Sequence, residues 1–255
     1  FNWLASGAED DRTTKLNSSY LDKIKIYPKV FAKNFNFSLK TKFLNCDISS
    51  PLLLSPMGHQ AQFHKNGEVE MAKGVTLANS VSFFSTQSRF TFNEIRKKNP
   101  NAKMVWQIFL FGNKEWILNE IKRAENYGSV AIALCLDAPI RSHRFKDRES
   151  RYDARKYGKM RRLSQNPSYA LRYDWSIIKW IKSKTKKPII LKGIINLHDA
   201  YKAKKYKIST LWISNHGGRM FNSGISSGEA LKFIRSKIGK KITIIVDGGV
   251  TKGTD

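Results

Sequence analysis

The chain has 255 residues, of which 41% are hydrophobic and 26% charged, and its formal net charge is +26. Length and composition fit one globular domain with a sizeable core, and no apolar run reaches the roughly 18 residues that a membrane span requires. Lysines and arginines are spread over the whole sequence, so we interpret the positive charge as a general bias of the amino-acid composition. We therefore expect no nucleic-acid partner.

Cysteine usage indicates a reduced compartment. Cys46 and Cys135 are the only two cysteines and lie far apart in the sequence, which predicts no disulfide framework. We therefore expect a cytoplasmic protein, with peripheral attachment to a membrane as the alternative.

Short apolar runs alternate with amphipathic stretches from residue 51 onward, a pattern typical of parallel βα units. Residues 1–50 do not follow it, and they predict short helices and a hairpin around residues 37–46 that cap one end of the fold. Amphipathic helices are predicted over residues 114–127, 174–180 and 226–239. The seven predicted strands are residues 52–56, 81–85, 104–109, 130–136, 188–192, 209–214 and 242–247.

Polar side chains follow nearly every predicted strand, namely Ser55, Ser85, Gln107, Asp137, Lys192, His216 and Asp247. A (β/α)8 barrel builds its active site from the C-terminal ends of several strands, whereas an open doubly wound sheet concentrates it at one switch point. We therefore predict a single α/β domain over residues 1–255, a (β/α)8 TIM barrel with an N-terminal cap segment at residues 1–50 and strands one to seven in residues 51–255. An eighth βα unit would begin near Asp255, so we expect that unit to be missing and the chain to be a fragment.

The segment Ile213-Ser-Asn-His-Gly-Gly-Arg219 sets a titratable ring and a guanidinium around two glycines directly after a strand. His216 is the candidate general base, because the ordinary pKa of imidazole lies near neutral pH, and Asp137 is the candidate carboxylate that orients it. Arg219 and Arg144 are candidates for a carboxylate clamp, since guanidinium groups hold that anion in a planar, bidentate manner.

Two further strand ends carry charge. Lys192 follows an apolar run, so its amine is expected to face an anion or a developing negative charge in the barrel mouth. Asp247 precedes Gly248 and Gly249, which allow backbone N–H groups to approach a phosphate. The five histidines show no ligand spacing with cysteines or carboxylates, so no metal site is predicted.

These motifs together resemble the FMN-dependent α-hydroxy-acid oxidases and dehydrogenases, the group that contains glycolate oxidase, lactate oxidase, mandelate dehydrogenase and the flavin domain of flavocytochrome b2. The resemblance runs over essentially the whole chain, and its most specific elements are Ser214-Asn-His-Gly-Gly-Arg219 and Asp247-Gly-Gly-Val250. It implies a barrel that holds FMN at its mouth and oxidises an L-2-hydroxy acid to the 2-oxo acid, by a hydride or a carbanion route. It also implies oxygen, a quinone or a cytochrome as electron acceptor, and a homo-oligomer, a tetramer in the family.

The resemblance also implies roles for single residues. His216 would be the catalytic base with Asp137 as its partner, and Arg219 and Arg144 would bind the substrate carboxylate. Lys192 would lie beside flavin N1 and stabilise the reduced, anionic ring. The other cofactor contacts that it implies are Pro56, Met57, Gly58, Ser85, Gln107, Cys135, Ser214, Asp247, Gly248 and Gly249.

Several positions depart from the family pattern. Trp3 and Phe109 stand where the family has substrate-facing tyrosines, so two hydrogen bonds to the substrate are lost and a bulkier or more apolar substrate than glycolate is implied. Cys135 stands for a threonine and is a weaker hydrogen-bonding partner for the flavin edge. Thr251 replaces an arginine of the phosphate region.

Two other functions stay open on the sequence alone. One is a related FMN barrel of different chemistry, similar to type 2 isopentenyl diphosphate isomerase, for which the missing tyrosines leave room. The other is a catalytically silent, basic binding protein on an old flavin scaffold, which the net charge and the same losses favour.

Overall fold

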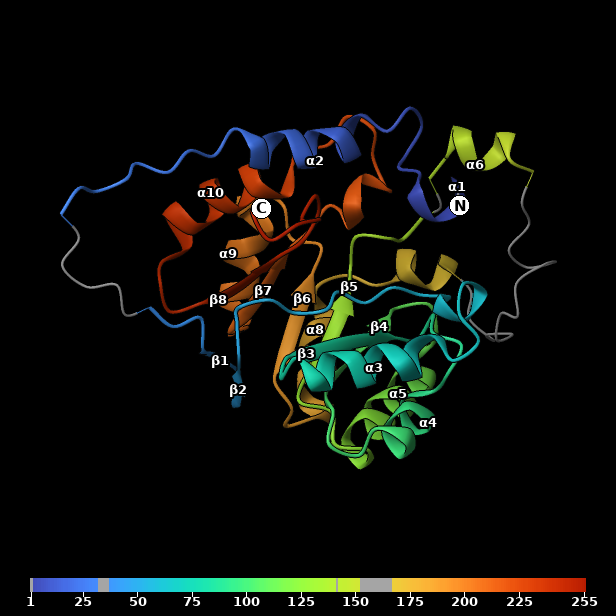
Figure 1. Cartoon of the computed structure of the whole chain (residues 1–255). Coiled ribbons are helices and arrows are strands. Elements are labelled where there is room, and N and C mark those ends of the chain that lie inside the picture. The colour runs from blue at the N-terminus through green and yellow to red at the C-terminus, as the bar shows by residue number, and fades with distance from the viewer. Residues whose placement is uncertain (1, 32–36, 141, 152–166) are drawn as a thin grey trace.

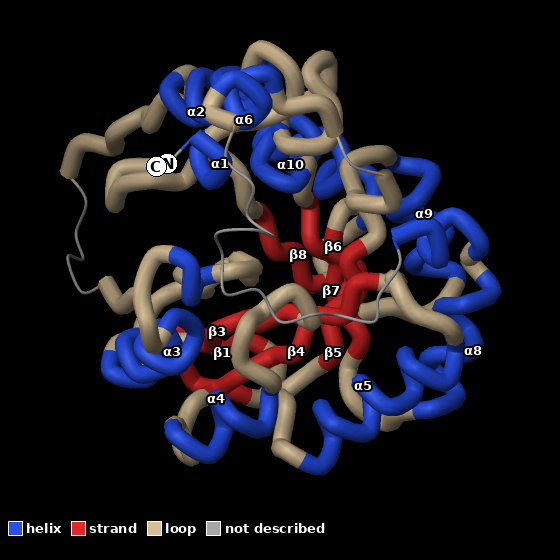
Figure 2. The backbone as a smooth tube through the Cα atoms, turned by 90° about the vertical axis from the view of Figure 1, so that its right-hand side faces the viewer, coloured by secondary structure: helices blue, strands red, loops and turns tan. Residues whose placement is uncertain are grey.

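A curled parallel sheet forms the centre of the molecule in the computed structural model, which describes residues 2–31, 37–140, 142–151 and 167–255 (Figure 1). Within these ranges six strands pair in the order of the chain, so each strand lies beside the one before it. Helices ring the sheet on its outer side (Figure 2). The strands are β3 (Val81–Ser85), β4 (Lys103–Phe109), β5 (Ile132–Cys135), β6 (Ile189–Lys192), β7 (Thr210–Ile213) and β8 (Thr243–Val246).

The outer helices alternate with the strands in sequence, the first of them before β3 and each of the others after a strand, as in βα units. They are α3 (Gly67–Leu77), α4 (Phe92–Lys98), α5 (Lys114–Asn126), α8 (Ser176–Lys184), α9 (Leu197–Lys205) and α10 (Ser227–Ile238). The three predicted helices are confirmed as α5, α8 and α10, with α8 running past the predicted end at residue 180. Asn113 and Ser226 cap α5 and α10 by accepting a hydrogen bond from a backbone N–H of the first turn.

Two hydrophobic cores result from the period-two alternation of side chains along each strand. One face of the sheet packs against the helices through residues such as Phe84, Trp106 and Leu134. The other face points into the curl and carries Val81, Phe83, Val105, Ala133, Ile190, Trp212 and Ile245. Both faces are therefore buried, as in a barrel.

The predicted first strand at residues 52–56 is wrong as a strand. Leu54 alone makes a parallel bridge to Ser82, donating its N–H to Val81 at 3.1 Å and accepting from Phe83 at 3.1 Å. Pro51 and Pro56 flank this point and lack the N–H groups that would extend the ladder. The described sheet accordingly has six strands in place of the predicted seven.

The N-terminal segment serves both ends of the sheet, whereas the sequence predicts that it caps one. The hairpin is confirmed a few residues later than predicted, as β1 (Thr41–Phe43) and β2 (Cys46–Ile48), and Phe43 and Ile48 close the inner core at the strands' N-terminal ends. Helix α2 (Arg12–Asp22) lies instead over the C-terminal ends (Figure 1). The short helix α1 (Asn2–Ala5) precedes it.

Candidate active site

A ring of polar side chains lies at the C-terminal ends of the strands, on the face that points into the curl. Each member stands two residues after an apolar residue of the inner core, for example Ile190 before Lys192 and Trp212 before Ser214. Because side chains alternate along a strand, this spacing puts the polar groups directly above the inner core. The ring consists of Ser85, Gln107, Cys135, Lys192, Ser214 and Asp247.

The chain turns sharply after β7 and carries a histidine into this ring. His216, Gly217 and Gly218 form the short helix η3 (His216–Gly218), and their φ angles are 58°, 66° and 75°. Three successive residues in the left-handed region are tolerated here because two of them are glycines. A Cβ on Gly218 would also lie 2.4 Å from the backbone nitrogen of Thr14 in α2. The double glycine thus permits both the turn and the close approach of α2.

Helix α2 holds this turn through a reciprocal amide pair that the sequence analysis missed. Asn17 Nδ2 donates to Asn215 Oδ1 at 3.0 Å, and Asn215 Nδ2 donates to Asn17 Oδ1 at 2.7 Å. Thr14 Oγ1 adds a bond to the carbonyl oxygen of Gly217 at 3.0 Å. Asn17 is buried although α2 is a mainly polar helix, and no signal in the linear sequence distinguishes it from the other polar residues of that helix.

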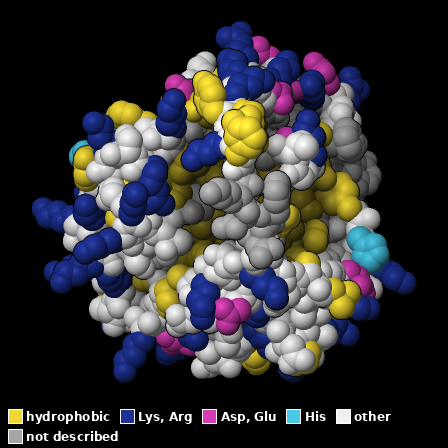
Figure 3. Space-filling view, turned by 60° about the vertical axis from the view of Figure 1, so that its left-hand side comes forward, with side chains coloured by type: hydrophobic (Ala, Val, Ile, Leu, Met, Phe, Trp, Pro, Cys, Tyr) yellow, Lys and Arg dark blue, Asp and Glu magenta, His cyan; other side chains and the backbone are white. Residues whose placement is uncertain are grey.

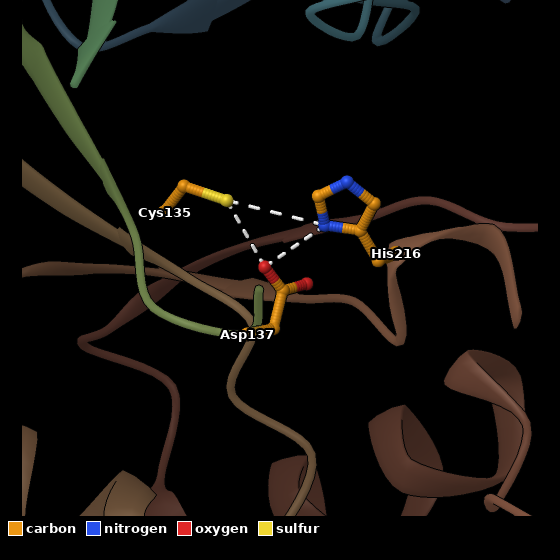
Figure 4. A group of neighbouring side chains, drawn as sticks. All are labelled: Cys135, Asp137 and His216. Atoms are coloured by element: carbon orange, nitrogen blue, oxygen red, sulfur yellow. Dashed lines mark hydrogen bonds and ion pairs between the residues drawn. The ribbon is translucent and has the colours of Figure 1, made fainter. Parts of the chain in front are cut away.

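His216 and Asp137 are brought together although they lie far apart in the sequence. His216 Nδ1 is 3.0 Å from Asp137 Oδ1, and the ring's other nitrogen points away from the carboxylate (Figure 4). The thiol of Cys135 donates to the same oxygen at 3.0 Å. The ring of Phe109 lies beside the imidazole, with centroids 6.2 Å apart. This arrangement favours the tautomer in which Nδ1 carries the proton, because Asp137 can only accept.

Lys192 lies between two carboxylates in a nearly closed site. Its Nζ is 3.7 Å from Asp137 Oδ2 and 3.4 Å from Asp247 Oδ2, and it donates to Ser214 Oγ at 2.7 Å. Below it, the Trp212 ring centroid is 5.4 Å away. Burial alone would lower the pKa of Lys192, but attraction to Asp137 and then Asp247 outweighs it and raises the pKa well above its ordinary value.

The Asp137 carboxylate is ionised for the same reason. Burial opposes its charged form, yet the charges of Lys192 and His216 and the hydrogen bonds from His216 and Cys135 hold its pKa well below the ordinary value. The thiol of Cys135 behaves in the opposite way, because burial and then the neighbouring Asp137 charge raise its pKa well above the usual range. At neutral pH the site therefore contains a carboxylate and a thiol.

Arg219 extends from η3 toward the N-terminal segment. Its Nη2 donates to the carbonyl oxygen of Leu4 in α1 at 2.8 Å, and burial lowers its pKa although Asp247 and Asp11 attract the charged form. Ser142 donates to the backbone carbonyl of Arg219. Two residues further on, half-buried Arg144 immediately precedes α6 (Phe145–Glu149) and pairs with Glu9 through a backbone bridge. The side chain of Trp3 lies outside the described part of the structure.

The residues implied in cofactor binding surround the same mouth. Gln107 is 2% exposed, and its Oε1 meets no donor among the described residues. Ser85 accepts a bond from Gln87 N at 3.1 Å, which ties β3 to the loop that Gly58 contacts. Pro56 and Met57 are half-buried on the loop that carries Gly58.

Asp247 and the two glycines after it close the opposite side of the mouth. Ser55 Oγ donates to Asp247 Oδ2 at 3.3 Å, while Asp247 Oδ1 is buried without a hydrogen-bond donor among the described groups. Gly248 and Gly249 have φ angles of 96° and 89°, and a Cβ on Gly249 would lie 2.8 Å from the Asn17 backbone. These positions therefore require glycine.

Two other features adjoin the site. A cavity of about 240 Å³ opens beside the ends of β4, β5 and β6 and is lined by Phe111, Leu136 and Tyr173 among others. Figure 3 shows a hollow with hydrophobic walls on one face of the molecule, around which lysines and arginines are scattered.

No metal site is predicted from the sequence, yet Cys135, Asp137 and His216 bring ligand atoms within 4.8 Å of one another. Linear spacing could not predict this cluster, because its histidine comes from another strand.

The sequence of the chain matches known proteins over its whole length. A sequence model of the FMN-dependent dehydrogenase family matches residues 1–255. The chain is 29% identical to a peroxisomal (S)-2-hydroxyacid oxidase of Arabidopsis thaliana, covering 100% of this chain and 74% of that protein. It is 27% identical to an L-lactate oxidase of a Nostoc species, covering 100% and 76%.

Solved structures agree with the predicted fold. A tyrosine-to-phenylalanine mutant of mandelate oxidase, determined with an FMN adduct, superposes with a TM-score of 0.91 at 23% identity, over 100% of this chain and 75% of that one. The prediction of a TIM barrel is thereby confirmed. Among the described helices, none combines the length and the apolar character needed to cross a membrane.

Proposed function

Since the chain belongs to the FMN-dependent dehydrogenase family, whose cofactor is FMN, we propose that it oxidises an L-2-hydroxy acid to the 2-oxo acid at the C-terminal ends of β5 to β8. The observation that carries the proposal is the contact of 3.0 Å between His216 Nδ1 and Asp137 Oδ1 inside a ring of polar side chains. We also propose that residues 1–255 act as one FMN-binding domain.

The residues at the mouth fit FMN on three counts. The buried Oε1 of Gln107 needs a donor from outside the described residues, and the ring N–H of an isoalloxazine is such a donor. The ammonium of Lys192 suits a ring that becomes anionic on reduction. Gly248 and Gly249 let backbone N–H groups approach a ribityl phosphate. FMN, when bound, supplies a two-electron acceptor for the substrate's α-hydrogen.

His216 is proposed as the base that accepts a proton from the substrate. With the Nδ1 proton donated to Asp137, Nε2 carries the free lone pair and points away from the carboxylate (Figure 4). As His216 becomes an imidazolium, the Asp137 charge stabilises it without itself taking the proton. The same pair serves a hydride and a carbanion route, because each removes one proton from the substrate.

Arg219 and Arg144 are proposed to hold the substrate carboxylate. Arg219 leaves the same short turn as His216, so base and anion-binding group arrive from one loop. Its guanidinium has donors to spare beyond the bond to Leu4, since the group offers five N–H bonds. The hydrogen bond from the Ser142 hydroxyl to the backbone carbonyl of Arg219 brings the segment that carries Arg144 to this side of the mouth.

The substrate is proposed to carry an apolar side chain. Phe109 lies beside His216 and stacks against Phe111, with centroids 4.9 Å apart, so the wall next to the base lacks a hydroxyl. The S configuration is supported by the (S)-2-hydroxyacid oxidase and the L-lactate oxidase among the relatives. Oxygen, as in those oxidases, is the first acceptor to test, followed by quinones and cytochromes. Cytoplasmic location and a tetrameric state remain predictions.

The test is anaerobic mixing of the FMN-loaded protein with a panel of (S)- and (R)-2-hydroxy acids of increasing side-chain size. We expect bleaching of the flavin absorption by (S)-acids with apolar side chains, and at least a ~10²-fold slower bleaching in His216→Ala, the scale of a lost general base. Absence of bleaching across the whole panel would overturn the proposal. Turnover of an isoprenoid diphosphate without net oxidation would favour the isomerase alternative instead.

A further inference from the structure

Three side chains at the centre of the site have the chemistry of a zinc ligand set. Cys135 comes from the end of β5, Asp137 follows it, and His216 enters from η3 (Figure 4). Thiolate, carboxylate and imidazole are the three ligand types that Zn²⁺ takes in proteins. We propose that Cys135, Asp137 and His216 form an inhibitory binding site for a thiophilic divalent cation, with Zn²⁺ as the best match.

The distances within the cluster suit such an ion. Sγ to Oδ1 and Nδ1 to Oδ1 are both 3.0 Å, and Sγ to Nδ1 is 3.9 Å. A point about 2.0 Å from all three atoms lies within this triangle, and moving it about 1 Å out of the plane gives separations of about 2.2 Å, which match zinc bond lengths. Three protein ligands leave a further coordination position open for water.

Access supports entry of a cation from the histidine side. Asp137 and Asp247 supply two negative charges, and the positive charges near them are the ammonium of Lys192 and, at Asp247, the guanidinium of Arg219. Lys192 contacts Oδ2 of Asp137, so Oδ1 is the oxygen that faces the thiol and the imidazole. The side chain of His216 is 25% exposed, whereas that of Asp137 is 10% exposed. The nearby ammonium limits the affinity, which suits a reversible effector better than a permanent metal.

Binding would block the base without occupying the substrate's place. The metal takes the lone pair of Nδ1, so the ring's proton moves to Nε2, and the thiol proton is released to solvent as the sulfur–metal bond forms. One proton leaves per ion bound, and no electron is transferred. Nε2 then carries a hydrogen and no free lone pair, so it cannot accept a proton from the substrate. This inhibitory effect rests on the proposed function, whereas the binding itself does not.

Cobalt provides a readout of binding that is independent of turnover. Co²⁺ added to the FMN-loaded protein should give d–d bands on the long-wavelength side of the flavin absorption and a thiolate charge-transfer band, saturating at one ion per chain. We expect at least a tenfold loss of affinity in Cys135→Ser and in His216→Gln, because each lacks one ligand. Cys46→Ser, which removes the other free cysteine, is the matched control and should bind Co²⁺ as the parent does.

Zinc inhibition is the second readout. Zn²⁺ should lower kcat for the 2-hydroxy acid while KM stays within about twofold, and a chelator should restore the rate. Equal cobalt affinity in the parent and Cys135→Ser, dependence on Cys46, or purely competitive inhibition would each overturn the proposal. Should Cys135→Ser fail to fold, mass spectrometry of the parent decides: Zn²⁺ must slow alkylation of Cys135 relative to Cys46. If no 2-hydroxy acid is turned over, the proposed function fails while the cobalt result still decides the metal site.

Discussion

Asn17 and Asn215 are 198 positions apart in the sequence, yet their side-chain amides exchange two hydrogen bonds at the edge of the site. Asn17 Oδ1 also accepts from the backbone N–H of Ser227 at the start of α10. One side chain of α2 therefore joins the turn that carries His216 to the helix that follows it. The N-terminal segment is in this way part of the site's framework.

Replacing Asn17 with alanine should destabilise the protein. The change removes one hydrogen-bond partner from each end of the Asn215 amide, which keeps Gly218 N and the Ile225 carbonyl oxygen. It also leaves the buried N–H of Ser227 without its acceptor, which costs about 1–3 kcal/mol for a buried polar group. Urea unfolding measures the loss. Ser19→Ala on the exposed side of the same helix is the control and should change the free energy of unfolding by less than ~0.5 kcal/mol. Equal effects of the two substitutions would contradict the stabilising role of the Asn17–Asn215 hydrogen bonds.

Gly218→Ala should be far more damaging than Gly74→Ala. At Gly218 the φ of 75° disfavours any side chain, and the new Cβ would meet Thr14 N at 2.4 Å. We expect a loss above ~2 kcal/mol in the free energy of unfolding. At Gly74, within α3, a Cβ meets nothing within 4 Å, so alanine should stabilise by about 0.5–1 kcal/mol through helix propensity. Thermal melts of both variants provide the comparison.

Lys192→Met should destabilise by about 3–5 kcal/mol, the usual cost of removing one partner from a buried ionic cluster. It leaves Asp137 and Asp247 facing each other's charge without the ammonium between them. Adding Asp247→Asn should recover part of the loss, because one uncompensated charge is then removed. Lys205→Met, at an exposed position on α9, is the matched control. A double variant no more stable than Lys192→Met would argue against the coupling.

Protonation of Asp137 should contribute to the pH dependence of the free energy of unfolding. Its pKa is depressed in the folded protein, so its contribution is fully present above the ordinary aspartate pKa of about 4 and is lost as pH falls toward the folded-state value. Asp137→Asn should therefore show a shallower fall of unfolding free energy between about pH 4 and pH 2. Urea titrations at a series of pH values measure the two slopes. Parallel curves for parent and variant would refute the depressed pKa.

Phe109→Tyr should shift specificity toward small 2-hydroxy acids. A phenol beside His216 would restore a hydrogen bond to the substrate, worth about a factor of ten in kcat/KM. Lactate should gain more than an acid with a bulky aromatic side chain. The ratio of the two kcat/KM values is the measurement, and Phe111→Tyr, one aromatic ring further from the base, is the control. An unchanged ratio would remove Phe109 from the substrate wall.

Much of the site's framework follows from local pattern. Strands with both faces buried appear in the sequence as apolar runs. In each run, the first polar residue on the inward face, such as Lys192 or Gln107, marks where the inner core ends. The expectation that His216 meets Asp137 also follows, because the C-terminal ends of parallel strands in one curled sheet face the same mouth, although β6 lies between β5 and β7. These inferences need only the period of two and the order of the strands.

Features that depend on a partner elsewhere in the chain were missed. Asn17 is one polar residue in a polar helix, and nothing around it indicates that it faces Asn215. The run at Leu52 has the composition of a strand, but a strand also needs neighbours and free N–H groups, which the flanking prolines do not provide. The cluster of Cys135 with Asp137 and His216 likewise forms only when β5 and β7 are folded into one mouth.

The indole of Trp212 contacts both the inner hydrophobic core and the polar side chains at the mouth of the barrel. It packs edge-on against Phe83 with centroids 4.7 Å apart, and the ammonium of Lys192 lies 5.4 Å from its centroid. The attraction between a cation and an aromatic face favours one position of the ammonium relative to the ring. A change of side-chain volume at either aromatic position would therefore displace the positive charge at the mouth, although neither ring reaches solvent. Packing in the inner core of this chain therefore helps to set where the Lys192 ammonium lies at the mouth.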